Sequence, residues 1–223
     1  MNLMKQLSGI CLALCLSVSL MAQEKGTGRI PDELFYLMPK FADGTVYFRG
    51  QNPAQGKLNI CAADNTLRFI DENGKELAAN AESVENIIMV QIDTVQFMYD
   101  QNAFYRKYPV TSNIGIAHKR DIHILKGAKK GAYGMVDQTS SIRQYSTLYS
   151  EGMAYNLDTG DPYEVVETMF LYINHAIVPF TKKNIKKAFP AKKDEIDAWF
   201  KAGNSLPKTE EEALPVLRQW AKK

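Results

Sequence analysis

The stretch TLRFIDENGKEL, Thr66 to Leu77, decides the fold prediction for this chain. Leu67 and Phe69 alternate with their neighbours, which is the period of a strand that buries one face. Asn73-Gly74 then reverses the chain, because both residue types tolerate positive φ. The residues after this turn start back along the first strand. The stretch therefore predicts a β-hairpin.

Strand signals of the same kind extend over Gly44 to Leu125. Short apolar and aromatic runs recur about every 8–12 residues, and turn signals such as Asp93-Thr94 and Asp100-Gln101-Asn102 separate them. Ala42-Asp43-Gly44 is interpreted as the turn before the first strand, and residues 23–43 as an extended arm on the sheet. The pattern predicts an antiparallel meander, sandwich or partial barrel of about seven to nine strands.

Tyr163 to Phe180 returns to strand-like sequence after a long polar segment. The runs EVVETMFLYI and AIVPF flank Asn174-His175, a plausible hairpin turn. A buried helix is the alternative for this segment, because short apolar runs do not distinguish a helix from a strand.

The C-terminal segment predicts helices. Thr181 is placed to cap the first helix and Thr209 to cap the last, where Thr209-Glu210-Glu211-Glu212 has the spacing of a capping box. Pro215 conflicts with that last helix, because an interior proline costs about 3 kcal/mol. A short or kinked helix is therefore expected there. Together the patterns predict a mainly β (α+β) fold, with an antiparallel β-rich domain over 23–180 and a helical appendage packed on it over 181–223.

The first 22 residues are typical of a signal peptide. Lys5 is the only charge ahead of an apolar run from Leu7 to Met21, and Ala22 offers a small residue at which cleavage can occur. The run is too short and too rich in Ser and Gly for a stable membrane span, although anchoring by the uncut segment is the alternative. We therefore expect export to the periplasm or cell surface, with cleavage after Ala22.

Cleavage after Ala22 would remove two of the three cysteines, Cys11 and Cys15. Each follows a large apolar residue, whereas lipid attachment needs a small one, so a soluble product is favoured over a lipidated one. Cys61 alone would remain, and the exported chain would rely on its hydrophobic core without an intramolecular disulfide. Cys61 is predicted to be a small buried residue, with a reactive thiol as the alternative.

Basic residues gather towards the C-terminus. From residue 182 onward the chain has eleven basic and six acidic residues, a net charge of +5, whereas residues 23–181 carry a net charge of −4. Lys182, Lys183, Lys186 and Lys187 have the spacing of an outer helical face. They are predicted to form a binding surface for anionic partners. The alternative is an ordinary solvated face.

A second candidate binding surface lies in the segment Gly127 to Pro162, which is rich in Gly, Ser, Thr and Tyr. Tyr133, Arg143, Tyr145 and Tyr149 stand among its small polar residues. Long loops of this composition are often functional, and such mixtures bind through flat aromatic contacts and adaptable hydrogen bonds. Further edge strands with tyrosines covering the sheet are the alternative.

The ionisable residues predict neither a catalytic nor a metal site. His118 and His123 would point to opposite faces of one strand, so they cannot share a metal ion without a bulge. Carboxylate pairs such as Asp158 and Asp161 fall in turn-like sequence. General acid and base roles need a defined spacing across a cleft. No cofactor, metal or nucleic-acid partner is therefore predicted.

Three segments carry a resemblance to a known group of proteins: GKLNICAADNTLRFIDENGKELA (Gly56 to Ala78), KKGAYGMVDQTSSI (Lys129 to Ile142) and KKAFPAKKDEIDAWFK (Lys186 to Lys201). They resemble uncharacterised exported β-rich proteins common in Bacteroidota, over most of the mature chain. The resemblance implies an exported β-rich body with a C-terminal helical appendage. It implies no activity and therefore no catalytic residues.

These observations favour an exported, non-enzymatic binding or interaction protein of the periplasm or cell surface. Its partner would be an envelope component or another protein. The alternative is a small envelope- or glycan-directed hydrolase, with a site assembled from dispersed residues that the sequence cannot connect.

Overall fold

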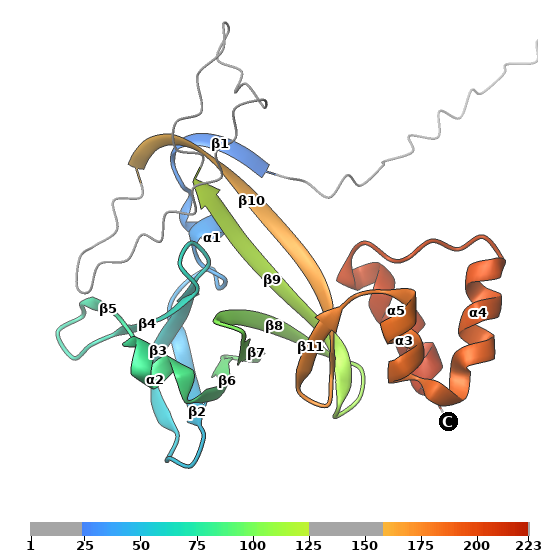
Figure 1. The fold of residues 1–223 in the computed structure, drawn as a ribbon. Helices are drawn as coiled ribbons and strands as arrows, with labels where there is room; N and C mark the ends of the chain where they lie inside the picture. Colours follow the sequence, from blue (N-terminus) through green and yellow to red (C-terminus); the bar gives the residue numbers. More distant parts are fainter. Residues whose placement is uncertain (1–23, 125–157, 223) are drawn as a thin grey trace, which may run out of the picture.

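The computed structural model describes residues 24–124 and 158–222, in which one antiparallel sheet dominates (Figure 1). The strand order is β1-β10-β9-β8-β7-β6-β2-β3-β4-β5, and β11 pairs with β10 beside this path. The strands are β1 (Glu24–Arg29), β2 (Ala42–Phe48), β3 (Ala54–Cys61), β4 (Thr66–Ile70), β5 (Glu76–Ala78), β6 (Ile87–Ile92), β7 (Val95–Asp100), β8 (Ala103–Pro109), β9 (Ile114–Ile124), β10 (Asp158–Ile173) and β11 (Ala176–Pro179). The prediction of a mainly β, antiparallel fold is confirmed, as one open sheet with eleven described strands.

Short helices interrupt and follow the sheet. Two lie within the β-rich part, α1 (Asp32–Phe35) and α2 (Ala81–Glu85). The chain then ends in α3 (Lys182–Ala188), a 3-10 turn (Pro190–Lys192), α4 (Lys193–Lys201) and α5 (Glu210–Ala221). Figure 1 shows these last helices gathered beside the lower end of β9 and β10.

The predicted hairpin joins β4 to β5, but its turn differs from the expected one. Asp71 N donates to Lys75 O at 2.9 Å, so three residues form the loop, and only the last of them, Gly74, has positive φ (78°). The Asp71 carboxylate accepts from Asn73 N at 2.9 Å and from Lys75 N at 2.8 Å. The turn therefore depends on Gly74 and on the Asp71 side chain, and not on positive φ at Asn73.

Three other predicted turns are confirmed. Asp93-Thr94 joins β6 to β7, and Gln101-Asn102 joins β7 to β8, each as a two-residue connection. Asn174-His175 joins β10 to β11 with φ of 50° and 69°. Positive φ at both central residues matches the right-handed twist of paired strands. The alternative of a buried helix over Tyr163 to Phe180 is wrong.

Two predictions for the first part of the chain need correction. Ala42-Asp43-Gly44 is not a turn but the beginning of β2, where Gly44 pairs with Gly56 of β3 and with Ile92 of β6. The expected arm over residues 23–43 includes β1, which forms the sheet edge next to β10, and the helix α1. The pairing partner of β1 lies more than a hundred residues away, so local sequence could not indicate it.

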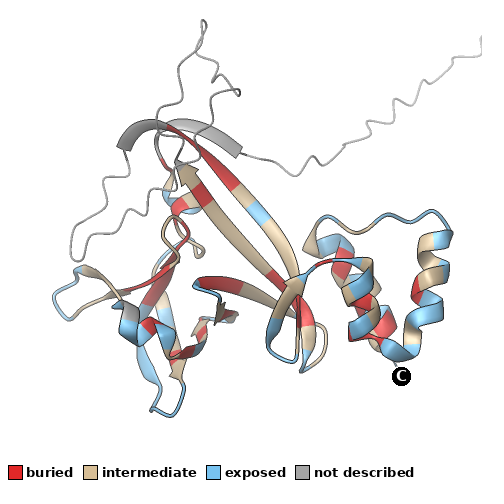
Figure 2. Cartoon of the chain, viewed as in Figure 1, coloured by how far each residue is buried: buried red, intermediate tan, exposed pale blue. Residues whose placement is uncertain are grey.

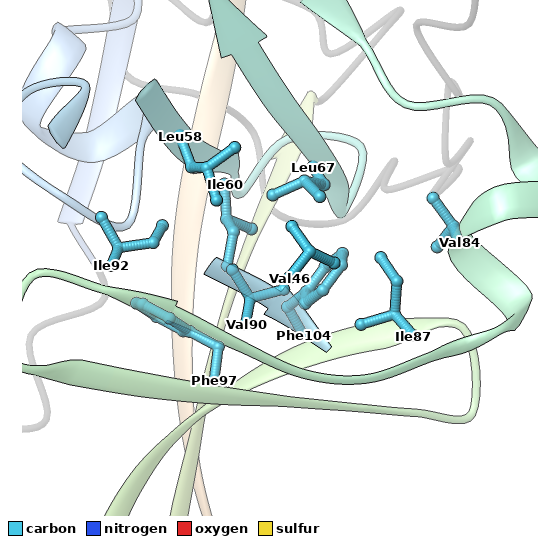
Figure 3. Close-up of a cluster of buried hydrophobic side chains, with 10 residues drawn as sticks. All are labelled: Val46, Leu58, Ile60, Leu67, Val84, Ile87, Val90, Ile92, Phe97 and Phe104. Carbon is cyan, nitrogen blue, oxygen red and sulfur yellow. The ribbon is translucent and has the colours of Figure 1, made fainter. Parts of the chain in front are cut away.

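The core face of the sheet carries an apolar cluster of ten buried residues, which Figure 3 shows at close range. Register places Val46 opposite Val90 and Val90 opposite Phe97, so these buried side chains share one face. The cluster is made of Val46, Leu58, Ile60, Leu67, Val84, Ile87, Val90, Ile92, Phe97 and Phe104. Burial of apolar area of this kind is the main source of stability for the β-rich part.

A second cluster shows that the sheet curls. Cys61 at the end of β3 packs with Ile122 of β9 and Val165 of β10, although several strands separate them in the sheet. Ile30 and Phe35, on either side of the start of α1, fill the space between these ends. The curl brings the end of β3 close to β9 and β10, and Figure 2 shows buried residues in both parts of the sheet.

The helices bury their apolar stripes against the lower end of β9 and β10. Ile185, Ile196, Leu217 and Trp220 pack with Leu171 of β10 in one cluster. The predicted caps are confirmed: Thr181 accepts from Asn184 N, and Thr209 accepts from Glu212 N, both at 3.3 Å. α5 continues through Pro215 instead of ending there. Burial of Leu217 and Trp220 beyond it opposes the loss of one backbone hydrogen bond.

The β4–β5 turn gives a stability prediction. Gly74→Ala should lower the free energy of unfolding by about 1–2 kcal/mol, because an alanine disfavours positive φ. Asp71→Ala should lower it by about 1 kcal/mol, since two backbone N–H groups lose their acceptor. Glu72→Ala, in the same exposed turn, should change it by less than about 0.5 kcal/mol. Urea unfolding measures all three, and equal effects of Asp71→Ala and Glu72→Ala would contradict the role of the Asp71 carboxylate.

Candidate functional site

The predicted basic face lies on α3, and packing fixes its direction. Thr181 caps the helix, while Ile185 and Ala188 are buried against the cluster beneath. Because residues three and four apart share a helical face, this burial turns the lysines of α3 outward. The prediction that these lysines form the outer face of a helix is confirmed.

Five lysines surround an open depression of about 460 Å³ on this face, and we call it the lysine depression. Four of them are the predicted residues of α3, and the fifth begins α4: Lys182, Lys183, Lys186, Lys187 and Lys193. The prediction missed Lys193, because nothing in the sequence shows that the 3-10 turn at Pro190 brings the start of α4 back beside α3.

One carboxylate, Asp197 of α4, organises part of the lysine depression. Lys182 Nζ lies 2.7 Å from its Oδ1 and Lys186 Nζ lies 2.6 Å from its Oδ2. Lys182 Nζ also lies 4.9 Å from the ring centroid of Phe200. The hydrogen bonds from these two ammonium groups lower the pKa of Asp197 to about 2. Both lysines are thereby held in place, and α3 is tied to α4.

The other three lysines are uncommitted. Within residues 24–124 and 158–222, Lys183, Lys187 and Lys193 make no ion pair. Among the described residues, Asp197 is the only carboxylate that forms an ion pair with any of the five lysines. Ammonium groups are compact point charges that bind phosphate and carboxylate without a fixed orientation. The arrangement can therefore hold an anionic group, and it would do so in a salt-dependent way.

The second predicted binding surface cannot be located in the part of the chain that the structure describes. Tyr133, Arg143, Tyr145 and Tyr149 fall in residues 125–157, outside the described residues. Their role in binding stays a prediction. The preceding interpretation of Gly127 to Pro162 as one loop needs a correction at its end, because residues 158–162 already belong to β10.

A polar network that the sequence did not reveal joins the sheet to the helices. His118 of β9 lies 3.5 Å from Glu167 of β10, measured from Nε2 to Oε2, and 3.7 Å from Glu210 of α5, measured from Nδ1 to Oε1. Tyr108 of β8 donates to Glu210 Oε1 at 2.9 Å. Burial, followed by the Glu210 carboxylate, raises the pKa of Tyr108. The phenol thus stays a hydrogen-bond donor at neutral pH.

Arg120 completes the His118 network. Its Nε donates to Glu167 Oε1 at 2.7 Å, and its Nη1 donates to the Glu33 backbone oxygen at 3.0 Å. His118 and His123 lie at positions of opposite parity in an unbroken pairing with β10, so they point to opposite faces, as alternation predicted. The network links five separated segments: α1, β8, β9, β10 and α5. Only the opposite parity of the two histidines could be predicted from the sequence.

A second polar network, separate from the His118 network, lies around the buried Cys61. Arg68 Nη2 lies 2.7 Å from Asp64 Oδ2, and the Asp64 side chain is fully buried. Tyr36 donates to Glu76 at 2.9 Å beside this pair. Burial, followed by the Asp64 carboxylate, raises the pKa of the Cys61 thiol. The thiol is therefore protonated at neutral pH and is a poor nucleophile, so the prediction of a buried structural cysteine is favoured over a reactive one.

Comparisons with known proteins place no further constraint on either network or on the lysine depression. No protein-family model, curated protein or solved structure matches this chain. In the part of the chain that the structure describes, no helix has the length and apolar character needed to cross a bilayer.

The ion pairs of Asp197 with Lys182 and Lys186, which we call the Asp197 clamp, give a titration prediction. A pKa of about 2 lies below the value of an unpaired aspartate, so the ionised form stabilises the α3–α4 contact. That contribution is present above the pKa of the unfolded chain, about 3.9, and is lost as the pH falls through about 2. Carboxyl NMR should show the midpoint of Asp197 rising in Lys186→Gln and staying in place in Lys187→Gln. An unchanged midpoint in Lys186→Gln would contradict the clamp.

Proposed function

We propose that this chain is an exported, non-enzymatic binding protein of the periplasm or cell surface, and that the lysine depression contacts an anionic envelope component. The observation that carries the proposal is the convergence of five lysines on one open depression, of which only Lys182 and Lys186 form ion pairs among the described residues. Charge of one sign concentrated on one face attracts oppositely charged surfaces over several ångströms.

The geometry supports binding of an extended anionic surface in particular. The depression is open and its three uncommitted lysines lie on two helices, so their ammonium groups can contact separate anionic groups at once. Lys182 and Lys186 are held by Asp197 and extend the positive field without needing to move. Each lysine near an anionic membrane surface contributes about 1 kcal/mol of attraction.

Export is the part of the proposal that rests on the first 22 residues. Their basic start, apolar run and small residue at position 22 support translocation and cleavage. The resemblance to exported β-rich proteins common in Bacteroidota supports the same location. Mass analysis of the protein from cell fractions should find a mature form that starts at Gln23, and a cytoplasmic chain that retains Met1 would contradict export.

A hydrolase acting on envelope or glycan material is the second candidate, and the His118 network is the observation that favours it. It gathers an imidazole and two carboxylates from β9, β10 and α5, which the sequence could not connect. However, Arg120 holds Glu167 and Tyr108 holds Glu210. Both carboxylates are therefore engaged in joining the sheet to the helices, and we place the binding function first.

Vesicle binding tests the proposed function. Replacing Lys183, Lys187 and Lys193 by Gln removes the uncommitted charges and leaves the Asp197 clamp intact. The loss of up to about 3 kcal/mol predicts binding to phosphatidylglycerol-rich vesicles at least about tenfold weaker at low salt. Sedimentation with the vesicles measures the bound fraction, and the difference should shrink as salt rises.

A matched control separates local from net charge. Lys40, Lys57 and Lys75 are exposed residues of the β-rich part. Replacing all three by Gln changes the net charge equally and should leave vesicle binding within about twofold, because the contribution of a charge falls off over a Debye length. Equal losses in the two triple variants, or no binding by the unaltered protein, would rule out the lysine depression as the contact surface.

A further inference from the structure

A second depression, of about 480 Å³, lies over β2, β3 and β6, and we call it the polar depression. Its side chains are carboxylates, amides and a hydroxyl: Asp43, Thr45, Gln55, Gln91 and Asp93. Two glycines complete the lining. No lysine, arginine or apolar side chain lines it, which sets it apart from the lysine depression in both position and chemistry.

Strand register explains why these side chains meet. Thr45 of β2 pairs with Gln55 of β3 on one side and with Gln91 of β6 on the other. Paired residues share a face, and residues two apart on one strand share it as well. Asp43 therefore joins Thr45, and these two side chains lie with Gln55 and Gln91 on the face opposite the apolar core of Val46 and Val90. Asp93 follows β6 in the turn to β7 and lines the same depression.

Two glycines lie between the polar positions, and a side chain on either would point to the opposite, core face of the sheet, where Leu58 lies. They are Gly44 and Gly56, which pair with each other. A Cβ atom on Gly44 would lie 2.6 Å from the Gln91 backbone oxygen and 2.9 Å from a Leu58 methyl group, so this position accepts no side chain. The strands are thereby held close, and four of the five polar side chains stand on strands of the sheet, while Asp93 lies in the turn after β6.

The polar groups of this depression are available to a ligand. Among the described residues, the side chains of Asp43, Thr45, Gln55 and Asp93 make no hydrogen bond or ion pair within the chain. Only Gln91 is engaged, with Nε2 donating to the Asp93 backbone oxygen at 3.2 Å. In the His118 network, by contrast, every ionisable group has a partner. Uncommitted donors and acceptors on a fixed frame can bind without first breaking internal bonds.

The donor and acceptor pattern defines the class of ligand. Amides and the hydroxyl both donate and accept, whereas carboxylates only accept. The hydroxyl groups of a sugar need acceptors for their hydrogens and donors for their oxygens, which this set supplies. The two lining carboxylates outnumber Lys57, which register places opposite Asp43 on the same face, so they disfavour an anionic ligand. We propose that the polar depression is a binding site for a neutral saccharide, which is a site and ligand class separate from the lysine depression.

NMR titration of the full chain tests this proposal. The probes are the linear hexasaccharides maltohexaose, cellohexaose, xylohexaose and chitohexaose, each added to isotope-labelled protein. At least one should shift the backbone amide signals of Gly44 and Gly56 in a saturable way. Gln55→Ala, an exposed position, should weaken that binding by about tenfold, because bound hydroxyl groups lose their partner.

Two variants provide the controls. Gln96 pairs with Gln91 in the same cross-strand row but does not line the depression, so Gln96→Ala should leave the affinity within about twofold. The triple variant at Lys183, Lys187 and Lys193 should titrate like the unaltered protein, so that failure of the vesicle experiment does not bear on this one. Absence of a saturable shift with the whole panel would overturn the proposal. So would shifts mapping elsewhere, or equal effects of Gln55→Ala and Gln96→Ala.

Discussion

The backbone ladder between β9 and β10 is the constraint on which the rest of this structure depends. Eleven consecutive residues pair, from Ile114 with Ile173 to Ile124 with Tyr163. The lower end of this ladder provides the surface on which the three C-terminal helices bury their apolar stripes, and the upper end packs with α1 and the end of β3. Between the two apolar ends, the His118 network occupies the middle. One long strand pair thus holds both halves of the molecule.

This arrangement also determines which surfaces remain available. The core face of the sheet is filled by apolar clusters, and the inner faces of the helices are buried against β9 and β10. Two of the surfaces that stay open in the described residues are the outer face of α3 and α4, which is basic, and the opposite face of β2, β3 and β6, which is rich in amides and carboxylates. The two depressions have contrasting chemistry and lie on different elements. The two proposed sites therefore call for ligands of different chemistry.

Local interactions could be predicted from the sequence, and interactions between distant segments could not. The Asn174-His175 turn, the Thr181 and Thr209 caps and the outward lysines of α3 all depend on residues within about one turn of each other. The expected turn at Ala42-Asp43-Gly44 is wrong because glycine serves there for close packing beneath Gln91, which only the pairing of β2 with β6 reveals. Both the His118 network and the polar depression need the register of separated strands, which composition and spacing do not supply.

Hydrogen exchange resolved by residue tests the central claim most directly. If the β9–β10 ladder holds the two halves together, the amides of Ile116 to Ile122 and of Val165 to Leu171 should include the slowest in the described chain. They should exchange only through global unfolding, and more slowly than the amides of the β4–β5 hairpin at the sheet edge. Exchange in this ladder as fast as in that hairpin, with slow exchange confined to the helices, would contradict the account.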